Sequence, residues 1–262
     1  MKFMDYFFAE ERKKEILNIL KEKNKISVIE MSEKFKVSSS TIRNDLKELE
    51  AKQLLARTHG GALSQSIQTG FELKPALKEI DMLKEKKAIA KIAAKLIQDN
   101  DIIAIDTGTT TIELASAITY KKNLTVILND LRIASYLEKN SDFDIIFLGG
   151  KVRKGFHCTF SNNSIDILDN LNIDKSFITC NGVHLKKGVT TPNINMANLK
   201  RKIIQSSTKN FLLCDSSKIE NVSFAKVAPI SLINAIVTDS KAKKEILDTY
   251  KTLDVDVFTS DI

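Results

Sequence analysis

The stretch Val37-Ser38-Ser39-Ser40-Thr41-Ile42-Arg43-Asn44-Asp45-Leu46 decides the N-terminal fold of this 262-residue chain. A serine side chain can accept a hydrogen bond from the free backbone N–H groups of a first helical turn, so Ser38 is the expected cap of a helix. Ile42, Leu46 and Leu49 then fall at i, i+4 and i+7 and predict one buried stripe. The side chains expected on the other faces of this helix are short and polar, or basic.

Two further helices are predicted upstream of this one. Apolar periodicity indicates a helix from about residue 10 to 23, and the spacing of Ser27 to Glu30 fits a capping box at the start of a second helix. In a helix-turn-helix the second element crosses the DNA backbone and the third enters the major groove, and residues 28–49 supply both. An ordinary three-helix bundle with a solvated face is the alternative that periodicity alone does not exclude.

A small hairpin, or wing, is expected directly after the third helix. The Gly60-Gly61 pair permits a turn with positive φ, which would place Arg57 against a phosphate or the minor groove. His59 would either contact DNA or hold the glycine turn by a hydrogen bond. The candidate DNA-binding residues are Ser39, Ser40, Thr41, Arg43, Asn44, Lys47, Arg57 and His59.

The rest of the chain predicts a second, larger domain. Residues 64–78 lose the periodicity and mix small polar residues with Gly and Pro, so we expect a linker between residues 1–63 and residues 79–262. From residue 82 helical patterns alternate with short apolar strands, which predicts a mainly parallel α/β sheet covered by helices on both faces. The expected strands are Ile102 to Ile105, Leu124 to Leu128, Ile145 to Leu148, Phe177 to Cys180, Phe211 to Cys214 and Ala235 to Thr238.

Ligands of open α/β sheets bind at the carboxyl ends of the strands, where this chain is polar. The segment Asp106-Thr107-Gly108-Thr109-Thr110-Thr111 runs from a strand into a helix, and its N–H groups and hydroxyls suit a phosphate or another oxyanion. Simple helix capping by the threonines is the alternative. Asp106 would repel a phosphate, so we expect it to bind sugar hydroxyls or fix the loop. The candidate ligand-binding residues are Asp106, Gly108, Thr109, Thr110, Thr111, Asn129, Gly150, Arg153, Lys200 and Lys218.

Composition is ordinary for a globular protein, with 43% hydrophobic and 28% charged residues and a net charge of +7 that favours phosphate binding without proving it. No apolar run or leader pattern points to a membrane or to secretion, so a cytoplasmic location is expected. Cys158, Cys180 and Cys214 lack metal-site spacing and are interpreted as buried free thiols. The three histidines have no metal-ligand spacing either, and we predict no structural metal and no cofactor.

The motifs also support a resemblance. Val-Ser-x-x-Thr-Ile-Arg-x-Asp-Leu at 37–46, Leu-Glu at 49–50 and Arg-Thr-His-Gly-Gly-Ala at 57–62 resemble the DeoR family of bacterial transcriptional regulators. Asn44 stands where that family usually has a second arginine, so we expect an altered operator preference. Later segments of the chain resemble the same family: Asp-x-Gly-Thr-Thr at 106–110, Leu-Gly-Gly at 148–150, Thr-Pro at 191–192, Lys-Arg at 200–201, Asp-x-x-Lys at 215–218 and Thr-Asp at 238–239.

The resemblance implies a winged helix-turn-helix domain, a C-terminal domain similar in fold to ribose-5-phosphate isomerase, a phosphorylated sugar effector, a double-stranded DNA operator and a homodimer or homotetramer. It implies a regulator, most simply a repressor of a sugar-uptake or catabolic operon, and no enzyme. Met196 replaces a usual Glu and Ser161-Asn162-Asn163 replaces a Gly-containing turn, so a regulator without small-molecule sensing stays open. An isomerase with a DNA-binding head is the other alternative, with Asp106, the Gly-Thr-Thr loop and Lys218 as its polar groups. Glu113 and Asp215 are more simply explained as surface or loop-fixing residues.

Overall fold

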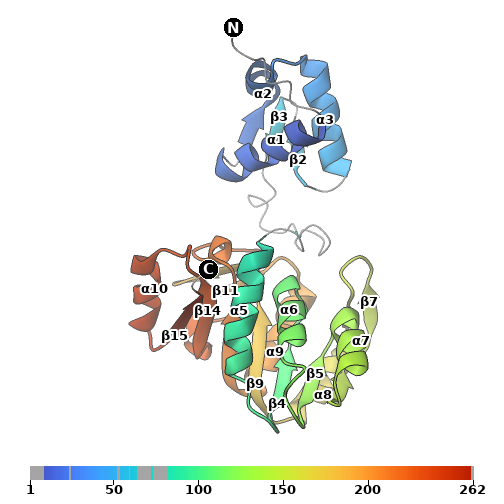
Figure 1. Ribbon diagram of the computed structural model, residues 1–262, viewed down its shortest axis with the longest axis vertical. Coiled ribbons are helices and arrows are strands. Elements are labelled where there is room, and N and C mark those ends of the chain that lie inside the picture. The colour runs from blue at the N-terminus through green and yellow to red at the C-terminus, as the bar shows by residue number, and fades with distance from the viewer. Residues whose placement is uncertain are drawn as a thin grey trace. The chain divides into compact units, whose positions relative to one another are not determined.

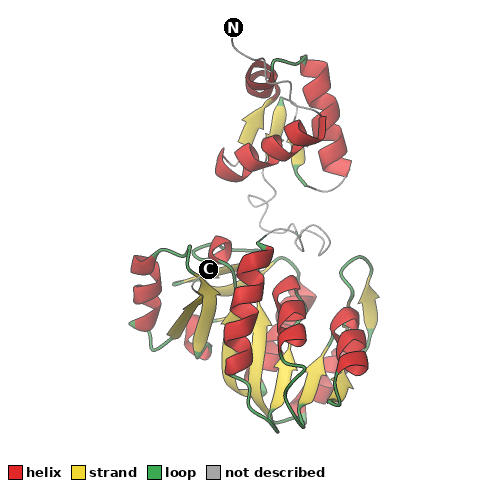
Figure 2. Ribbon diagram, viewed as in Figure 1, coloured by secondary structure: helices red, strands yellow, loops and turns green. Residues whose placement is uncertain are grey.

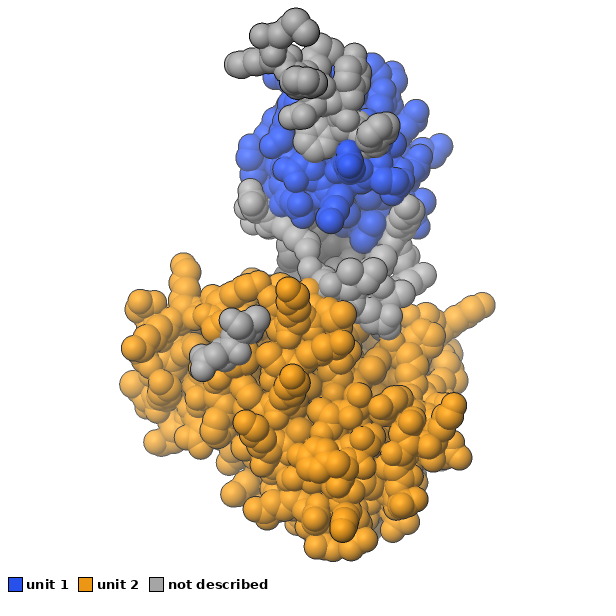
Figure 3. Space-filling model, in the orientation of Figure 1, with its two compact units in different colours: residues 1–73 blue, residues 74–262 orange. Residues whose placement is uncertain are grey.

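The structure, a computed structural model, describes residues 9–23, 25–51, 54–58, 60–63, 72 and 82–260, with only the backbone described at 21, 22, 56 and 63. The chain divides into two compact units, residues 1–73 and residues 74–262, here called the N-terminal and C-terminal units (Figure 3). The expected linker lies outside the described residues except for Glu72, and the candidate His59 lies outside them too.

The described residues of the N-terminal unit form three helices and three short strands, as predicted for a helix-turn-helix with a wing (Figure 1). Ser27 caps the second helix by accepting a hydrogen bond from the Glu30 backbone N–H at 3.0 Å. That helix ends at Lys36, which has a left-handed backbone with φ 53°. The elements are α1 Ala9–Lys23, β1 Lys25–Ser27, α2 Val28–Phe35, α3 Ser39–Ala51, β2 Ala56–Thr58 and β3 Gly61–Leu63.

The wing is a three-stranded antiparallel sheet in the order β1-β3-β2, so the strand before α2 joins a hairpin that was predicted alone. Gly61 is opposite Ser27, and a Cβ on Gly61 would come within 2.0 Å of the Ile26 carbonyl oxygen. The Gly60-Gly61 pair was expected to permit a turn with positive φ, but the backbone of Gly61 is not left-handed. The glycine is needed because β1 and β3 approach too closely for a side chain.

The C-terminal unit is built on a seven-stranded sheet with the order β15-β14-β12-β9-β4-β5-β6, in which every neighbouring pair is parallel (Figures 1 and 2). Helices α5, α6 and α7 pack on one face, and α8 and α9 pack on the other. The predicted α/β class and its mainly parallel sheet are confirmed. The main elements are α5 Leu83–Lys95, β4 Ile102–Ile105, α6 Thr109–Ala117, β5 Thr125–Leu128, α7 Leu131–Asn140, β6 Asp144–Phe147, α8 Asn162–Asp169, β9 Ile173–Thr179, α9 Ile194–Gln205, β12 Ser207–Leu213, β14 Ala235–Asp239, α10 Lys244–Lys251 and β15 Asp256–Ser260.

All six predicted strands lie in this sheet, while its edge strand β15 was not predicted. Two small antiparallel sheets were not predicted either. They are the pair β7-β8 and the three-stranded sheet β10-β11-β13. These strands are β7 Lys151–Arg153, β8 Cys158–Phe160, β10 Gly182–His184, β11 Gly188–Thr191 and β13 Ala225–Ala228, and the short 3-10 turns are η2 Ser216–Lys218 and η3 Ile230–Leu232.

Candidate functional site

The outward face of α3 carries the predicted DNA-binding side chains. Ser38 caps this helix as expected, since its Oγ accepts a hydrogen bond from the Thr41 N–H at 3.1 Å. The Thr41 hydroxyl lies 2.9 Å from the same Oγ, so Thr41 takes part in the cap. The exposed residues among the candidates on this helix are Ser40, Arg43, Asn44 and Lys47, whereas Ser39 and Thr41 are half-buried.

A buried ion pair holds α3 in place beneath that face. The Arg12 guanidinium of α1 donates to both carboxylate oxygens of Asp45, with Nε at 2.6 Å and Nη2 at 3.1 Å. The hydrogen bond to Asp45 raises the pKa of Arg12. Lys13 adds a second link to α3 through Glu48, at 2.5 Å. Asp45 therefore has a positioning role that the sequence analysis did not assign.

Arg57 is not a free cation in this structure. Its backbone N–H donates to Glu50 Oε1 at 3.1 Å, and its Nε lies 3.7 Å from Glu50 Oε2. The contact joins β2 to the end of α3, so it fixes the wing against the helix. Both side chains remain largely exposed, and solvent weakens such a pair.

The C-terminal unit has one position where its chain order reverses. From β4 the chain proceeds to β5 and β6 on one side, and it then returns to place β9 on the other side of β4. Ligands of open α/β sheets bind outside the carboxyl ends of the strands at such a point. The loop that begins at Asp106 follows β4 directly, and Thr179 ends β9. The predicted effector loop thus lies at the expected edge of the sheet.

Asp106, Thr179 and Lys200 form a buried cluster at this edge. Asp106 Oδ2 accepts hydrogen bonds from Thr179 N at 2.9 Å and Thr179 Oγ1 at 2.6 Å, and it pairs with the Lys200 ammonium group. Lys200 also donates to the Thr179 carbonyl oxygen at 3.1 Å. Lys200 was expected to be available to an anionic ligand, and this is corrected: its charge is already balanced by Asp106. Thr179 was not predicted as part of this site, because its hydroxyl on β9 contacts Asp106, which follows the neighbouring strand β4.

The start of α6 combines a close backbone contact with open N–H groups. A Cβ on Gly108 would lie 3.0 Å from Thr179 Cγ2 and Oγ1, so a larger residue would crowd the β9 end. Among the described residues no side chain caps α6. The Thr111 hydroxyl donates to the Gly108 carbonyl oxygen at 3.0 Å and so serves the helix itself, as the capping alternative predicts. Thr110 and Thr111 are buried, and Thr109 is half-buried.

Two side chains follow β5 at the same edge. Asn129 Nδ2 donates to the Thr159 carbonyl oxygen at 2.8 Å, while the buried Asn129 Oδ1 has no hydrogen-bond partner among the described residues. Asp130 caps α7 and accepts a hydrogen bond from Thr107 Oγ1 at 2.6 Å. An unsatisfied buried acceptor costs free energy that a donor hydroxyl would restore. The role of Thr107 and Asp130 in joining two loops was not predicted.

The remaining effector candidates have different surroundings. Gly150 has φ 127°, and a Cβ there would come within 2.5 Å of the Phe160 carbonyl oxygen, so its role is at least partly structural. Arg153 lies over the Phe156 ring, 4.1 Å from its centroid. Lys218 Nζ donates to Ser217 Oγ at 2.9 Å and is 3.8 Å from Asp215 Oδ2. Lys218 keeps a side-chain exposure of 30%, so it is more accessible than the buried Lys200.

Two positions that depart from the family pattern have ordinary structural roles. Met196 is buried on α9, with its Sδ 3.8 Å from Cys158 Sγ. Ser161 caps α8 by accepting a hydrogen bond from Ser164 N at 3.0 Å.

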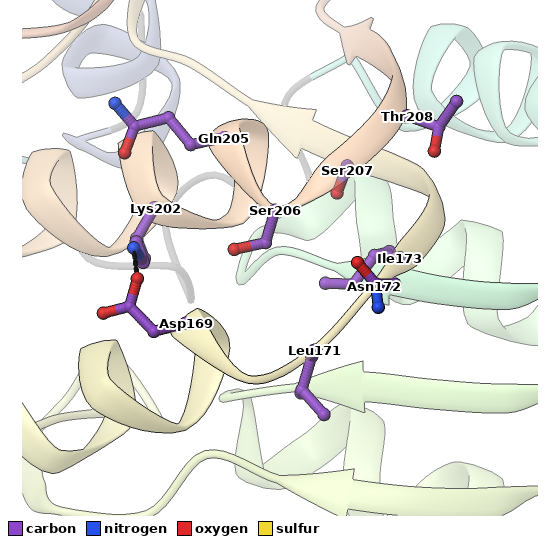
Figure 4. Close-up of a pocket in the computed structure, with 9 residues that line it drawn as sticks. All are labelled: Asp169, Leu171, Asn172, Ile173, Lys202, Gln205, Ser206, Ser207 and Thr208. Atoms are coloured by element: carbon purple, nitrogen blue, oxygen red, sulfur yellow. Dashed lines mark hydrogen bonds and ion pairs between the residues drawn. The ribbon is translucent and has the colours of Figure 1, made fainter.

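A surface pocket of about 360 Å³ lies at the opposite, amino-terminal edge of β9 and β12 (Figure 4). It includes the C-terminal ends of α8 and α9, where the negative end of each helix dipole disfavours an anion. Lys202 lies in this pocket and is paired with Asp169. The pocket therefore suits a phosphate poorly.

Other site classes find little support in the described part of the chain. It contains no group of three or more His, Cys, Asp and Glu residues placed to hold a metal ion. No helix described here combines the length and the apolarity that a membrane crossing requires.

Comparison with known proteins covers both units. The model of the DeoR-like helix-turn-helix domain matches residues 12–68, and that of the DeoR C terminal sensor domain matches residues 81–240. The HTH-type transcriptional regulator GolR of Listeria innocua serovar 6a is 32% identical over 247 residues, covering 93% of this chain and 96% of that protein. The lactose phosphotransferase system repressor of Staphylococcus epidermidis is 34% identical over 245 residues, covering 92% and 96%.

An uncharacterized HTH-type transcriptional regulator of Escherichia coli (strain K12), YgbI, is 33% identical over 229 residues, covering 87% of this chain and 89% of that protein. Among solved structures, ribose 5-phosphate isomerase A of Methanocaldococcus jannaschii matches with a TM-score of 0.40 and 14% identity, covering 53% of this chain and 55% of that chain. This last likeness is too weak to assign function.

Proposed function

Because the chain belongs to the DeoR family of transcriptional regulators, we propose that it represses a sugar-uptake or catabolic operon and is released by a phosphorylated sugar. The N-terminal unit would read a double-stranded DNA operator, and the C-terminal unit would hold the effector. The names of two relatives, a lactose phosphotransferase system repressor and a putative aga operon repressor, support a link to sugar operons.

The observation that carries the DNA-binding proposal is the exposed polar face of α3 above a fixed scaffold. Arg43, Asn44 and Lys47 are exposed on one helix, and the buried Arg12–Asp45 pair fixes that helix to α1. Exposed basic and amide side chains on a rigid helix are suited to base edges and phosphates of the major groove. Ser39, Ser40 and Thr41 at the helix start are proposed as backbone contacts, together with Arg57 and His59 of the wing.

A gel-shift assay on the promoter beside the gene tests this proposal. Arg43→Ala should weaken the affinity about tenfold, the loss of roughly 1–3 kcal/mol expected for one base contact. Lys91→Ala, an exposed change in the C-terminal unit, is the matched control. Unchanged affinity in both Arg43→Ala and Arg57→Ala would contradict the assignment of the reading surface.

The proposed effector site is the carboxyl edge of β4, β5 and β12. A phosphate would bind the open N–H groups at the start of α6, near Gly108, Thr109 and Thr110, with Lys218 or Arg153 as the cation. A sugar hydroxyl would satisfy the buried Asn129 Oδ1. Asp106 and Lys200 would act together by fixing the loop, with Thr111 and Gly150 shaping the backbone around the ligand.

Thermal unfolding with added ligands tests the effector proposal. Ribose 5-phosphate, fructose 1-phosphate and glucose 6-phosphate are suitable probes, with the free sugars as controls. A bound sugar phosphate should raise the unfolding temperature, and Lys218→Ala should reduce that shift while the exposed control Lys226→Ala retains it. No shift with any phosphorylated sugar would favour a regulator without small-molecule sensing, and turnover of ribose 5-phosphate would favour the isomerase alternative.

The assembly proposed for DNA binding is a homodimer or homotetramer. Helix-turn-helix proteins commonly read paired half-sites with two copies related by symmetry. The effector must favour one arrangement of the units or subunits over another, because a ligand with equal affinity for both cannot change DNA affinity. Light scattering of the purified protein, with and without operator DNA, measures the number of copies.

A further inference from the structure

Two cysteines lie opposite each other at the carboxyl ends of β9 and β12. These strands are parallel neighbours, and their register pairs Thr179 with Leu213. The next residues along the two strands are Cys180 and Cys214. Neighbouring strands are about 4.8 Å apart, within the range of roughly 4.4–6.8 Å between Cα atoms that a disulfide can bridge. The sheet therefore holds the two cysteines at a separation suited to a disulfide.

The two cysteines follow paired strand ends and differ in their access to solvent. The hydrogen bond with Cys180, together with burial, raises the pKa of Cys214. Cys214 is buried, but Cys180 is half-buried, so the prediction of three buried thiols is wrong for Cys180. Cys158 is buried elsewhere, beside Met196. All three are reduced in this structure.

We propose that Cys180 and Cys214 form a peroxide-sensitive dithiol that closes into an intramolecular disulfide. Cys180 is the sulfur that a small peroxide can reach, so it reacts first. Its sulfur attacks one peroxide oxygen, the O–O bond breaks, and the departing oxygen leaves as water (or as an alcohol) with the thiol proton. Cys180 is then a sulfenic acid.

The second step uses the neighbouring thiol. The Cys214 sulfur attacks the Cys180 sulfur, the S–S bond forms and the S–O bond breaks. The hydroxide leaves as water after taking the Cys214 proton. The two sulfurs together lose two electrons, and the peroxide gains them. Cys214 is buried and Cys180 is half-buried, so Cys180 meets the peroxide first and Cys214 resolves the sulfenic acid.

The disulfide would join two loops at the candidate effector edge. Thr179, just before Cys180, contacts Asp106 and Lys200. Asp215, just after Cys214, accepts a hydrogen bond from Ser217 N at 3.1 Å in the loop that carries Lys218. Oxidation would therefore link the end of β9, which contacts the Asp106 loop, to the end of β12, which leads into the loop that carries Lys218. The chemistry itself requires no effector and does not depend on the proposed function.

Treatment of the purified full-length protein with hydrogen peroxide, followed by alkylation and peptide mass spectrometry, tests the proposal. The expected product is a peptide pair linked through Cys180 and Cys214 that lacks two hydrogen atoms and is released by a reductant. In Cys214→Ser the sulfenic acid of Cys180 should persist and be trapped by dimedone. Cys158→Ser is the matched control and should form the same link as the wild type.

Three outcomes would overturn the proposal. They are wild-type Cys180 that oxidises to a sulfonic acid without a link, a link that uses Cys158, and a link between two chains in place of the one within a chain. The wild-type measurement decides among these even if a variant fails to fold.

Discussion

Each unit contains a buried aspartate paired with a cation from a separate helix, α1 or α9, but the two pairs occupy different places relative to the proposed binding surfaces. Asp45 pairs with Arg12 beneath the exposed face of α3, and the side chains offered to DNA are other residues of that helix. Asp106 lies in the proposed effector loop itself and pairs with Lys200 of α9. In the N-terminal unit the buried ion pair therefore supports a binding surface made of other residues. In the C-terminal unit the buried pair is itself part of the proposed binding loop.

The largest expected effect follows from breaking the pair in the C-terminal unit. Lys200→Met leaves the Asp106 carboxylate buried without its cation, and breaking such a pair costs about 4 kcal/mol of stability. The double variant Asp106→Asn with Lys200→Met removes both charges and should recover much of this loss. Urea unfolding followed by circular dichroism measures both. Wild-type stability of the single variant would show that the pair is not a support of the loop.

A slightly smaller loss is expected from Asp45→Ala in the N-terminal unit. The Arg12 guanidinium would lose both of its hydrogen bonds to Asp45, at a cost of about 3 kcal/mol. Hydrogen exchange of the α3 amides, measured by mass spectrometry, reports on this unit separately. Glu48→Ala is the matched control, because it removes a largely exposed partner of Lys13 and should cost less than about 1 kcal/mol. Equal exchange in the two variants would contradict the scaffold role of Asp45.

Breaking the exposed pair Arg57–Glu50 should strengthen DNA binding, whereas breaking either buried pair should destabilise the fold. Glu50→Ala removes a negative charge next to the expected phosphate contact and frees the Arg57 side chain. We expect affinity for the operator to increase about threefold, the size of one exposed ion pair. Gel-shift titration measures it, with Glu33→Ala on α2 as the control for the loss of an exposed carboxylate. Weaker binding by Glu50→Ala would mean that the wing must be held by this pair to bind DNA.

Local patterns in the sequence were sufficient for the three helices of the N-terminal unit and for six strands of the large sheet. Ile42, Leu46 and Leu49 are all buried on α3 as their spacing predicts, and Ser38 and Ser27 both cap helices. These features depend on residues within a few positions of each other, where periodicity and capping chemistry act. The strands of the small sheets have three or four residues and lack the apolar runs that mark the predicted strands of the large sheet.

The parts that were not predicted depend on residues far apart in the chain. Arg12 lies 33 positions from Asp45, and Asp106 lies 94 positions from Lys200. Which cation meets which carboxylate is decided by how helices pack, and no spacing in the sequence encodes it. Gly61 shows the same limit, because the space it needs is set by a strand that precedes α2. The sequence therefore identifies candidate charged residues, and the tertiary fold determines which of them pair.

The smallest effect is expected at Glu85 of α5, which pairs with Lys241 in the turn after β14. The hydrogen bond from Lys241 lowers the pKa of Glu85 below its ordinary value of 4.5. A carboxylate with a depressed pKa in the folded state stabilises the protein above its unfolded pKa, and this stabilisation is lost as the pH falls through the folded value. The pair should therefore contribute at neutral pH and fade below pH 4.5.

Glu85→Gln tests that assignment through thermal unfolding at neutral pH and at about pH 3. The variant should unfold at a lower temperature than the wild type at neutral pH, and the difference should shrink in acid as Glu85 of the wild type becomes protonated. Glu245→Gln, an exposed change on α10, is the control. A difference of the same size at both pH values would locate the effect of Glu85 in packing. The Glu85–Lys241 pair would then differ from Arg12–Asp45 and Asp106–Lys200, because its contribution to stability would not depend on charge.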